Sequence, residues 1–145
     1  MTAQAPERLL YKGENTSMST EPLNQYLRNR DDIEFVSKTT GCWRGYYGKW
    51  EIKDSKLYLV DLIAYIEGYK QVDLDYLFPK KKEVFANWFT GEVRIPTGEI
   101  LEYVHMGYES TFEKDIILQF QDGVMSSEKE IDNREEFKKK QLLKK

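Results

Sequence analysis

Apolar and polar residues alternate along residues 46–53, "YYGKWEIK", which is the pattern of a strand with one buried face. The face expected to be buried carries Tyr46, Gly48, Trp50 and Ile52. The next run, residues 56–66, has apolar side chains on both faces, and Leu57, Leu59 and Ile63 fall together on one of them. Strands that are apolar on both faces lie inside sheets, so we expect residues 56–66 to form a central strand after a turn at Asp54 and Ser55.

Three more stretches show the strand, turn, strand pattern of a hairpin. In "RLLYKGENTSMS" the turn is expected at residues 12–15, and Asp122–Gly123 is a strong turn signal within residues 113–131. The remaining hairpin is expected to turn at Pro96-Thr97-Gly98 and to return over residues 99–106. Proline has no N–H for a strand ladder and glycine suits a left-handed turn position, so this tripeptide is placed in a loop.

Two helices are expected, one near each end of the chain. Residues 19–30, "STEPLNQYLRNR", offer a Ser or Thr cap, a proline in the first turn and apolar residues at helical spacing. Near the C-terminus, Asn133 and Glu136 have the spacing of a capping box. The apolar face of this second segment is thin, so the helix is expected to fray or to stay partly disordered.

Together these elements predict a mainly β fold with minor helical content. The sequence indicates an antiparallel sheet or barrel-like sandwich of about eight strands, built from consecutive hairpins, with a short N-terminal helix and a C-terminal helical tail. Residues 1–131 are expected to form a single antiparallel β domain, and residues 132–145 a charged C-terminal helix or disordered tail.

Composition narrows the class of protein further. Aromatic residues make up 14% of the chain, which favours strands because large rings pack well on pleated surfaces. The formal net charge of −3 gives no overall field that would attract nucleic acid or anionic lipid. The single Cys42, and the lack of a secretory pattern or of an apolar run near the ~20 residues that span a bilayer, predict a cytoplasmic protein with no membrane partner.

His105 is the natural candidate for acid–base chemistry, because the ordinary pKa of histidine lies near neutrality. Such a role needs a carboxylate to orient the ring, and Glu102, Glu109 and Asp61 are the candidates. Glu102 is expected on the opposite face of the strand that carries His105. A structural or partner-contact role for His105 is therefore favoured, and His105 with Glu102 is kept as the catalytic alternative.

The sequence carries no signature of a metal or cofactor site. It has neither C-x-x-C nor H-x-x-x-H, and the glycines of "GCWRGYYG" are irregularly spaced and precede no capped helix. Asp73 and Asp75 fall in residues 71–83, which are expected to form a helical turn or surface loop. These two aspartates lack the further ligands of a calcium loop and are expected to be solvated. We therefore predict neither a metal nor a cofactor.

Aromatic and arginine side chains crowd together in "CWRGYYGKW", residues 42–50, and such residues are enriched at binding hot spots. The contact surface predicted from this run and from the edge of the third hairpin comprises Trp43, Arg44, Tyr47, Trp50, Tyr103, His105 and Tyr108. In the alternative, half of these rings fill the core and the rest form cross-strand pairs. The tail "FKKKQLLKK" would contact an acidic partner or nucleic acid, or would simply be solvated.

The runs "WRGYYGKWEIKDSKLYLVDL" and "ANWFTGEVRIPTGEILEYVHMGY" resemble small bacterial proteins to which no activity is assigned. The likeness covers roughly residues 40–125 and leaves both ends unmatched. The resemblance implies a compact bacterial cytoplasmic domain and carries over no catalytic residue.

The sequence thus favours a non-enzymatic, protein-binding or regulatory β domain, and an acidic protein of this kind would bind a basic partner. The alternative is a small enzyme or ligand-binding protein with His105 in a pocket between the sheet and the N-terminal helix. Binding of single-stranded nucleic acid by the aromatic run and the lysine tail is a third, less favoured hypothesis, because the net charge opposes it.

Overall fold

The computed structural model describes residues 5–102 and 111–143 of the 145-residue chain. The strands are β1 (Glu7–Tyr11), β2 (Glu14–Met18), β3 (Tyr46–Lys53), β4 (Lys56–Ile66), β5 (Lys70–Asp73), β6 (Val84–Phe85), β7 (Gly91–Glu102), β8 (Thr111–Gln121) and β9 (Val124–Asp132). The helical segments are α1 (Leu23–Leu27), the 3₁₀ turn η1 (Glu67–Tyr69), α2 (Leu74–Leu77) and α3 (Arg134–Leu143). The protein is mainly β, as the alternation of its side chains predicted.

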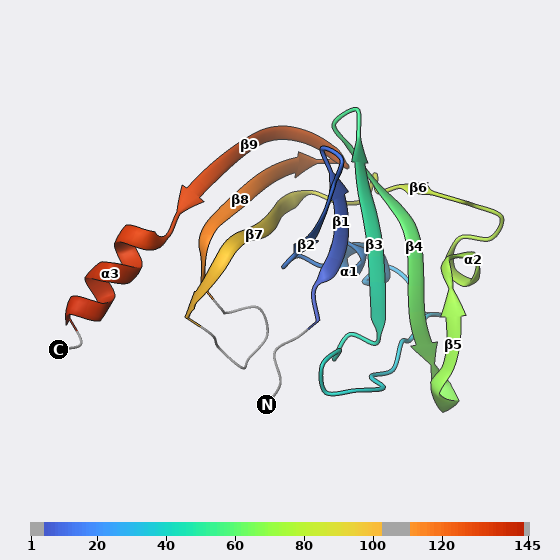
Figure 1. Cartoon of the computed structure of the whole chain (residues 1–145). Coiled ribbons are helices and arrows are strands. Elements are labelled where there is room, and N and C mark those ends of the chain that lie inside the picture. Colours follow the sequence, from blue (N-terminus) through green and yellow to red (C-terminus); the bar gives the residue numbers. More distant parts are fainter. Residues whose placement is uncertain (1–4, 103–110, 144–145) are drawn as a thin grey trace.

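The nine strands of the described residues form one mixed sheet that does not close (Figure 1). Its order is β2-β1-β3-β4-β9-β8-β7, and β5 and β6 both pair with β4. All neighbours are antiparallel except β1 and β3, which run parallel with Leu9 beside Trp50. The sequence predicted an antiparallel sheet or a barrel-like sandwich instead. The difference arises because α1 and residues 28–45 separate β2 from β3, so no tight turn fixes the direction of β3.

β4 is the central strand that the apolar pattern predicted. One of its edges pairs with β3, and the other is divided among β9 at Lys56, β6 at Tyr58 and Leu59, and β5 at Ile63–Ile66. From this junction β9, β8 and β7 sweep away from β3 and β4 (Figure 1). β4 therefore holds the two parts of the sheet together.

The core fills the space enclosed by this bent sheet, and its largest fully buried side chains include Trp50, Tyr46 and Phe120. α1 and α2 add Leu23 and Leu77 to the same core. The prediction that Tyr46 and Trp50 share a buried face is confirmed. Burial of side chains of this size stabilises the fold by about 1.5–3 kcal/mol for each one.

Along β4 the buried face switches between Leu59 and Leu62. A bulge causes the switch, because neighbouring residues of β3 pair with Leu59 and Asp61 and skip Val60. Ile63, which the alternation placed on the face of Leu59, therefore lies on the opposite face and is 41% exposed.

The Pro96-Thr97-Gly98 segment is a bulge inside β7, and the prediction of a turn there is wrong. Pro96 pairs with Asp115 of β8, and the register shifts after Thr97. Gly98 lies at this register shift and has a φ of +81°, which glycine adopts easily. Proline is tolerated because β7 is the last strand of the sheet, where the missing N–H breaks no ladder. The connection from β7 to β8 lies outside the described residues.

α3 begins directly after β9 and extends away from the sheet (Figure 1). Its cap differs from the expected capping box. The Asp132 carboxylate accepts a hydrogen bond from the backbone N–H of Arg134 (3.0 Å), whereas the Asn133 amide donates to Phe112 O and to Asp115 Oδ2 of β8. Asn133 therefore fastens the start of α3 to the sheet. Among the described residues, no helix has both the length and the apolar character needed to cross a membrane.

Candidate binding surface

The predicted contact residues around β3 do not form one surface. Trp50 is fully buried, and its indole N–H donates to Glu7 Oε1 (3.1 Å). The Arg44 side chain is 6% exposed and pairs with Glu7 Oε2 (Nη2 to Oε2, 2.6 Å). Only Trp43, which is 51% exposed, and the half-buried Tyr47 remain accessible from this group. Trp50 and Arg44 thus belong to the interior.

Glu7 is the centre of a buried polar cluster that joins β1 to β3. Its carboxylate accepts hydrogen bonds from Arg44, from Trp50 and from the backbone N–H of Gly48 (2.8 Å). Burial raises the pKa of Glu7, while the Arg44 guanidinium and the two N–H donors oppose that rise. The guanidinium also donates to Ala5 O (2.9 Å). Because every partner belongs to the fold itself, this cluster is structural.

A signal in the sequence pointed to this cluster. Glu7 alternates with Leu9 and Tyr11, so the period of two that buries those residues also buries Glu7. A buried carboxylate requires a cation or several donors. Arg44 meets that need from 37 residues further along the chain, and no local pattern links the two.

Apart from Asp61, which is exposed on β4, the other predicted contact and catalytic residues are not placed by the structure. Tyr103, His105, Tyr108 and Glu109 lie outside the described residues, and the side chain of Glu102 is not described either. The hypothesis that His105 acts in a pocket therefore stays a prediction.

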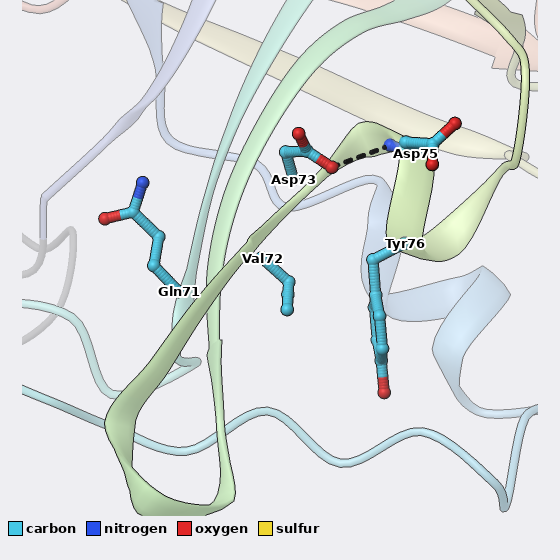
Figure 2. A pocket seen from close by; sticks show the side chains of 5 residues that line it. All are labelled: Gln71, Val72, Asp73, Asp75 and Tyr76. Carbon is cyan, nitrogen blue, oxygen red and sulfur yellow. Dashed lines mark hydrogen bonds between the residues drawn. The ribbon is translucent and has the colours of Figure 1, made fainter.

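Two open clefts adjoin each other where β5, α2 and the 31–36 segment meet, and Tyr76 lines both. The first, of ≈ 360 Å³, is lined by Gln71, Val72, Asp73, Asp75 and Tyr76 (Figure 2). The second, of ≈ 470 Å³, is lined by Asp32, Glu34, Val36, Ile66, Glu67 and Tyr76. We call these ten residues the Tyr76 surface.

Local structure explains how Tyr76 comes to be exposed. Asp73 Oδ1 accepts a hydrogen bond from Asp75 N (3.1 Å) and so caps α2, a helix of a single turn. This turn directs Leu74 and Leu77 into the core and leaves Tyr76 outside, 43% exposed. In Figure 2 the Tyr76 ring projects from α2 away from the carboxylates of Asp73 and Asp75. The sequence predicted a helical turn or a surface loop here, with solvated aspartates, but not the exposed ring.

The Tyr76 surface is strongly acidic, with five carboxylates among its ten residues. Asp32 is paired with Arg30 (Nε to Oδ1, 2.9 Å), and the hydrogen bonds from Arg30 lower the pKa of Asp32. Glu34 and Glu67 are exposed to solvent. Among the described residues, no three His, Cys, Asp or Glu side chains are grouped so that they could hold a metal ion. The negative charge is spread across the surface, which suits a ligand whose positive charge is also spread.

Comparison of the chain with protein-family models, with curated proteins and with solved structures found no match.

Proposed function

We propose that this protein is a small, non-enzymatic binding domain whose Tyr76 surface receives a basic segment of a partner protein. The observation that carries the proposal is the position of Tyr76, an exposed ring between two clefts whose linings include five carboxylates. A tyrosine face attracts Lys and Arg, and nearby carboxylates complete their hydrogen bonds and balance their charge.

The shape of the surface favours a polypeptide over a small cation. Both clefts are open to solvent, and their carboxylates stand on three separate stretches of chain, 31–36, 66–67 and 71–76. Val36, Ile66 and Val72 give the clefts an apolar component as well. An extended segment with two or more basic side chains would place one in each cleft and cover Tyr76 between them.

The proposed partner is basic, as the sequence predicted, but the proposed contact surface is the Tyr76 surface and not the residues around β3. Trp43 stays a candidate contact because it is exposed, whereas Arg44 and Trp50 donate hydrogen bonds to Glu7. Aromatic rings are hot spots only where a partner can reach them. Tyr76 meets that condition, and its charged surroundings indicate the sign of the partner.

A basic probe tests the proposal directly. We expect octalysine, added at low salt, to shift the backbone amide NMR signals of residues 66–76, and added salt to weaken its binding. Tyr76→Ala should raise the dissociation constant about two- to five-fold, the value of one exposed cation–π contact. Tyr69→Ala is the matched control, because Tyr69 is 61% exposed and does not line either cleft.

Two results would count against the proposal. One is a set of signal shifts that avoids residues 66–76. The other is a Tyr76→Ala variant that loses no more affinity than Tyr69→Ala, which would show that the Tyr76 ring makes no specific contact with the probe.

A further inference from the structure

The last segment of the chain is basic, while the rest is acidic. Residues 134–145 contain six Lys or Arg and two Glu, whereas residues 1–133 contain 16 basic and 23 acidic residues. In α3, Arg134, Lys138 and Lys139 are exposed. α3 leaves the end of β9 on the opposite side of the molecule from β5 and α2 (Figure 1). The chain therefore has a positive end and, far from it, the acidic Tyr76 surface.

α3 offers charge to a partner, because it has no continuous apolar stripe. Phe137 and Leu142 are five positions apart, which places them about 140° apart around the helix axis. Leu142 is 70% exposed and Phe137 is partly exposed. A coiled-coil seam or a helix lying in a membrane interface needs its apolar residues on one side. Apart from Leu142, the side chains described as exposed in α3 are charged, with Arg134, Lys138 and Lys139 basic and Glu135 and Glu136 acidic.

We infer that α3 docks on the Tyr76 surface of a second copy of this chain. The inference rests on the proposed function, since it names the basic segment that the Tyr76 surface takes up. The charges of α3 and of the Tyr76 surface are complementary, which is why we place α3 there. The six basic residues of the last segment match a surface with five carboxylates, and the acidic body repels nucleic acid and other polyanions.

The geometry makes the contact one between copies. Within one chain, α3 and the Tyr76 surface lie on opposite sides (Figure 1). If two copies lie side by side about a two-fold axis, each gives its α3 to the other and each receives one, and the assembly then closes as a dimer. The ten-residue helix is about 15 Å long, which is enough to span more than one side chain of the partner surface.

Sedimentation of the full chain over a range of concentrations tests the inference. We expect a dimer at roughly 0.05 M salt that dissociates at roughly 0.5 M salt. The variant K138E/K139E should raise the dimer dissociation constant about ten-fold or more, because attraction at two ion pairs becomes repulsion. E34K/E67K should do the same from the receiving side. K81E/K82E is the matched control, with the same charge change on two exposed lysines outside α3, and should leave the dimer intact.

Mixing the two charge-reversed variants gives the sharpest result. In an equimolar mixture of K138E/K139E and E34K/E67K, the new glutamates of one helix meet the new lysines of the other surface, and the unaltered helix meets the unaltered surface, so a heterodimer should form. A dimer that K138E/K139E leaves unchanged, or a mixture that stays monomeric, overturns the inference. If the full chain is monomeric but octalysine still shifts the signals of residues 66–76, the second copy is the wrong partner and the proposed function stands. If octalysine also leaves the signals of residues 66–76 unchanged, both the proposed function and the inferred dimer are wrong.

Discussion

Gly48 is the residue at which the buried polar cluster leaves least space. A Cβ at this position would collide with Glu7 Oε1 and would lie 2.7 Å from Trp50 Nε1. Gly48→Ala should therefore destabilise the protein by about 3 kcal/mol, because the added methyl group displaces the Glu7 carboxylate from its donors. Equilibrium unfolding in urea measures the change.

Gly41→Ala is the control for that prediction. The nearest atom to a Cβ at Gly41 is Thr39 Oγ1 at 3.9 Å, so the free energy of unfolding should stay within about 0.5 kcal/mol of the original value. Similar losses in the two variants would show that the tight approach around Glu7 contributes nothing to stability.

For single residues, the sequence predicted which side chains are buried better than it predicted which side chains are available for binding. The alternation on β3 placed Tyr46, Gly48 and Trp50 on the buried face, and they lie there. Residue type then assigned Trp50 to a contact surface. The acceptor that satisfies its buried indole N–H is Glu7, which is 43 residues away and which no local pattern identifies. Tyr76 was missed because its exposure follows from the cap of a one-turn helix, which hydrophobic periodicity does not detect.

Among the elements, tight turns were the most predictable features. Asp54–Ser55 and Asp122–Gly123 both have two central residues at positive φ, as two-residue hairpin turns require, and both were identified from sequence. Pro96-Thr97-Gly98 has similar turn chemistry but sits in a bulge. Pairing with β8 decides between a turn and a bulge, and that pairing is not a local property.

The start of α3 should resist acid more than an ordinary helix cap. Hydrogen bonds from the Arg134 side chain and backbone lower the pKa of Asp132 from 3.8 to about 2. A folded-state pKa below the ordinary value means that the charged cap stabilises α3 above about pH 4 and loses this effect as the pH falls toward 2. We expect the side-chain carboxyl NMR signal of Asp132 to stay constant from pH 6 to about pH 3.5 and to change only below that.

Asp132→Asn separates the charge from the hydrogen bond. An asparagine side chain still accepts from the Arg134 N–H but does not ionise, so the part of the Arg134 amide signal change that follows the Asp132 carboxyl below pH 3.5 should disappear. A wild-type Asp132 carboxyl transition centred near pH 4, or an Arg134 amide change below pH 3.5 that Asp132→Asn leaves as it was, would contradict the assignment of the cap to the Asp132 carboxylate.

β9 is an edge strand beyond its single contact with β4, and its charges protect it. Antiparallel pairing of two copies centred on Lys129 would set Glu128 opposite Glu130 and Lys129 opposite itself. The variant E128V/E130V removes this repulsion and should aggregate several-fold faster, as followed by thioflavin fluorescence. D31V/E83V, with the same loss of charge on two exposed residues outside the strands, should aggregate no faster than the original chain.

For the whole molecule, the decisive point is the corner at which β4, β9 and the 86–89 segment meet. Gly123 N donates to Phe89 O (2.7 Å), and Leu57 N donates to Gly123 O (3.0 Å). The bond from Leu57 connects the central strand to the β8–β9 turn, and the bond to Phe89 connects that turn to the 86–89 segment. The two parts of the sheet therefore share one junction and one core, so we expect them to unfold in a single transition.

Gly123→Ala tests whether that corner holds the two parts together. Gly123 has a φ of +81°, and a Cβ there would lie 2.5 Å from Ala86 O, so alanine brings both backbone strain and a collision with the main chain. Gly68→Ala is the matched control, because Gly68 has a φ of +80° with nothing within 4 Å and reports the strain alone. Gly123→Ala should lower the free energy of unfolding in urea by about 2 kcal/mol or more beyond the loss in Gly68→Ala. The amide hydrogens of β3 and β8 should also lose their protection from exchange together. If the two variants lose equal stability, or if β8 exchanges while β3 stays protected, the corner is not what couples the sheet.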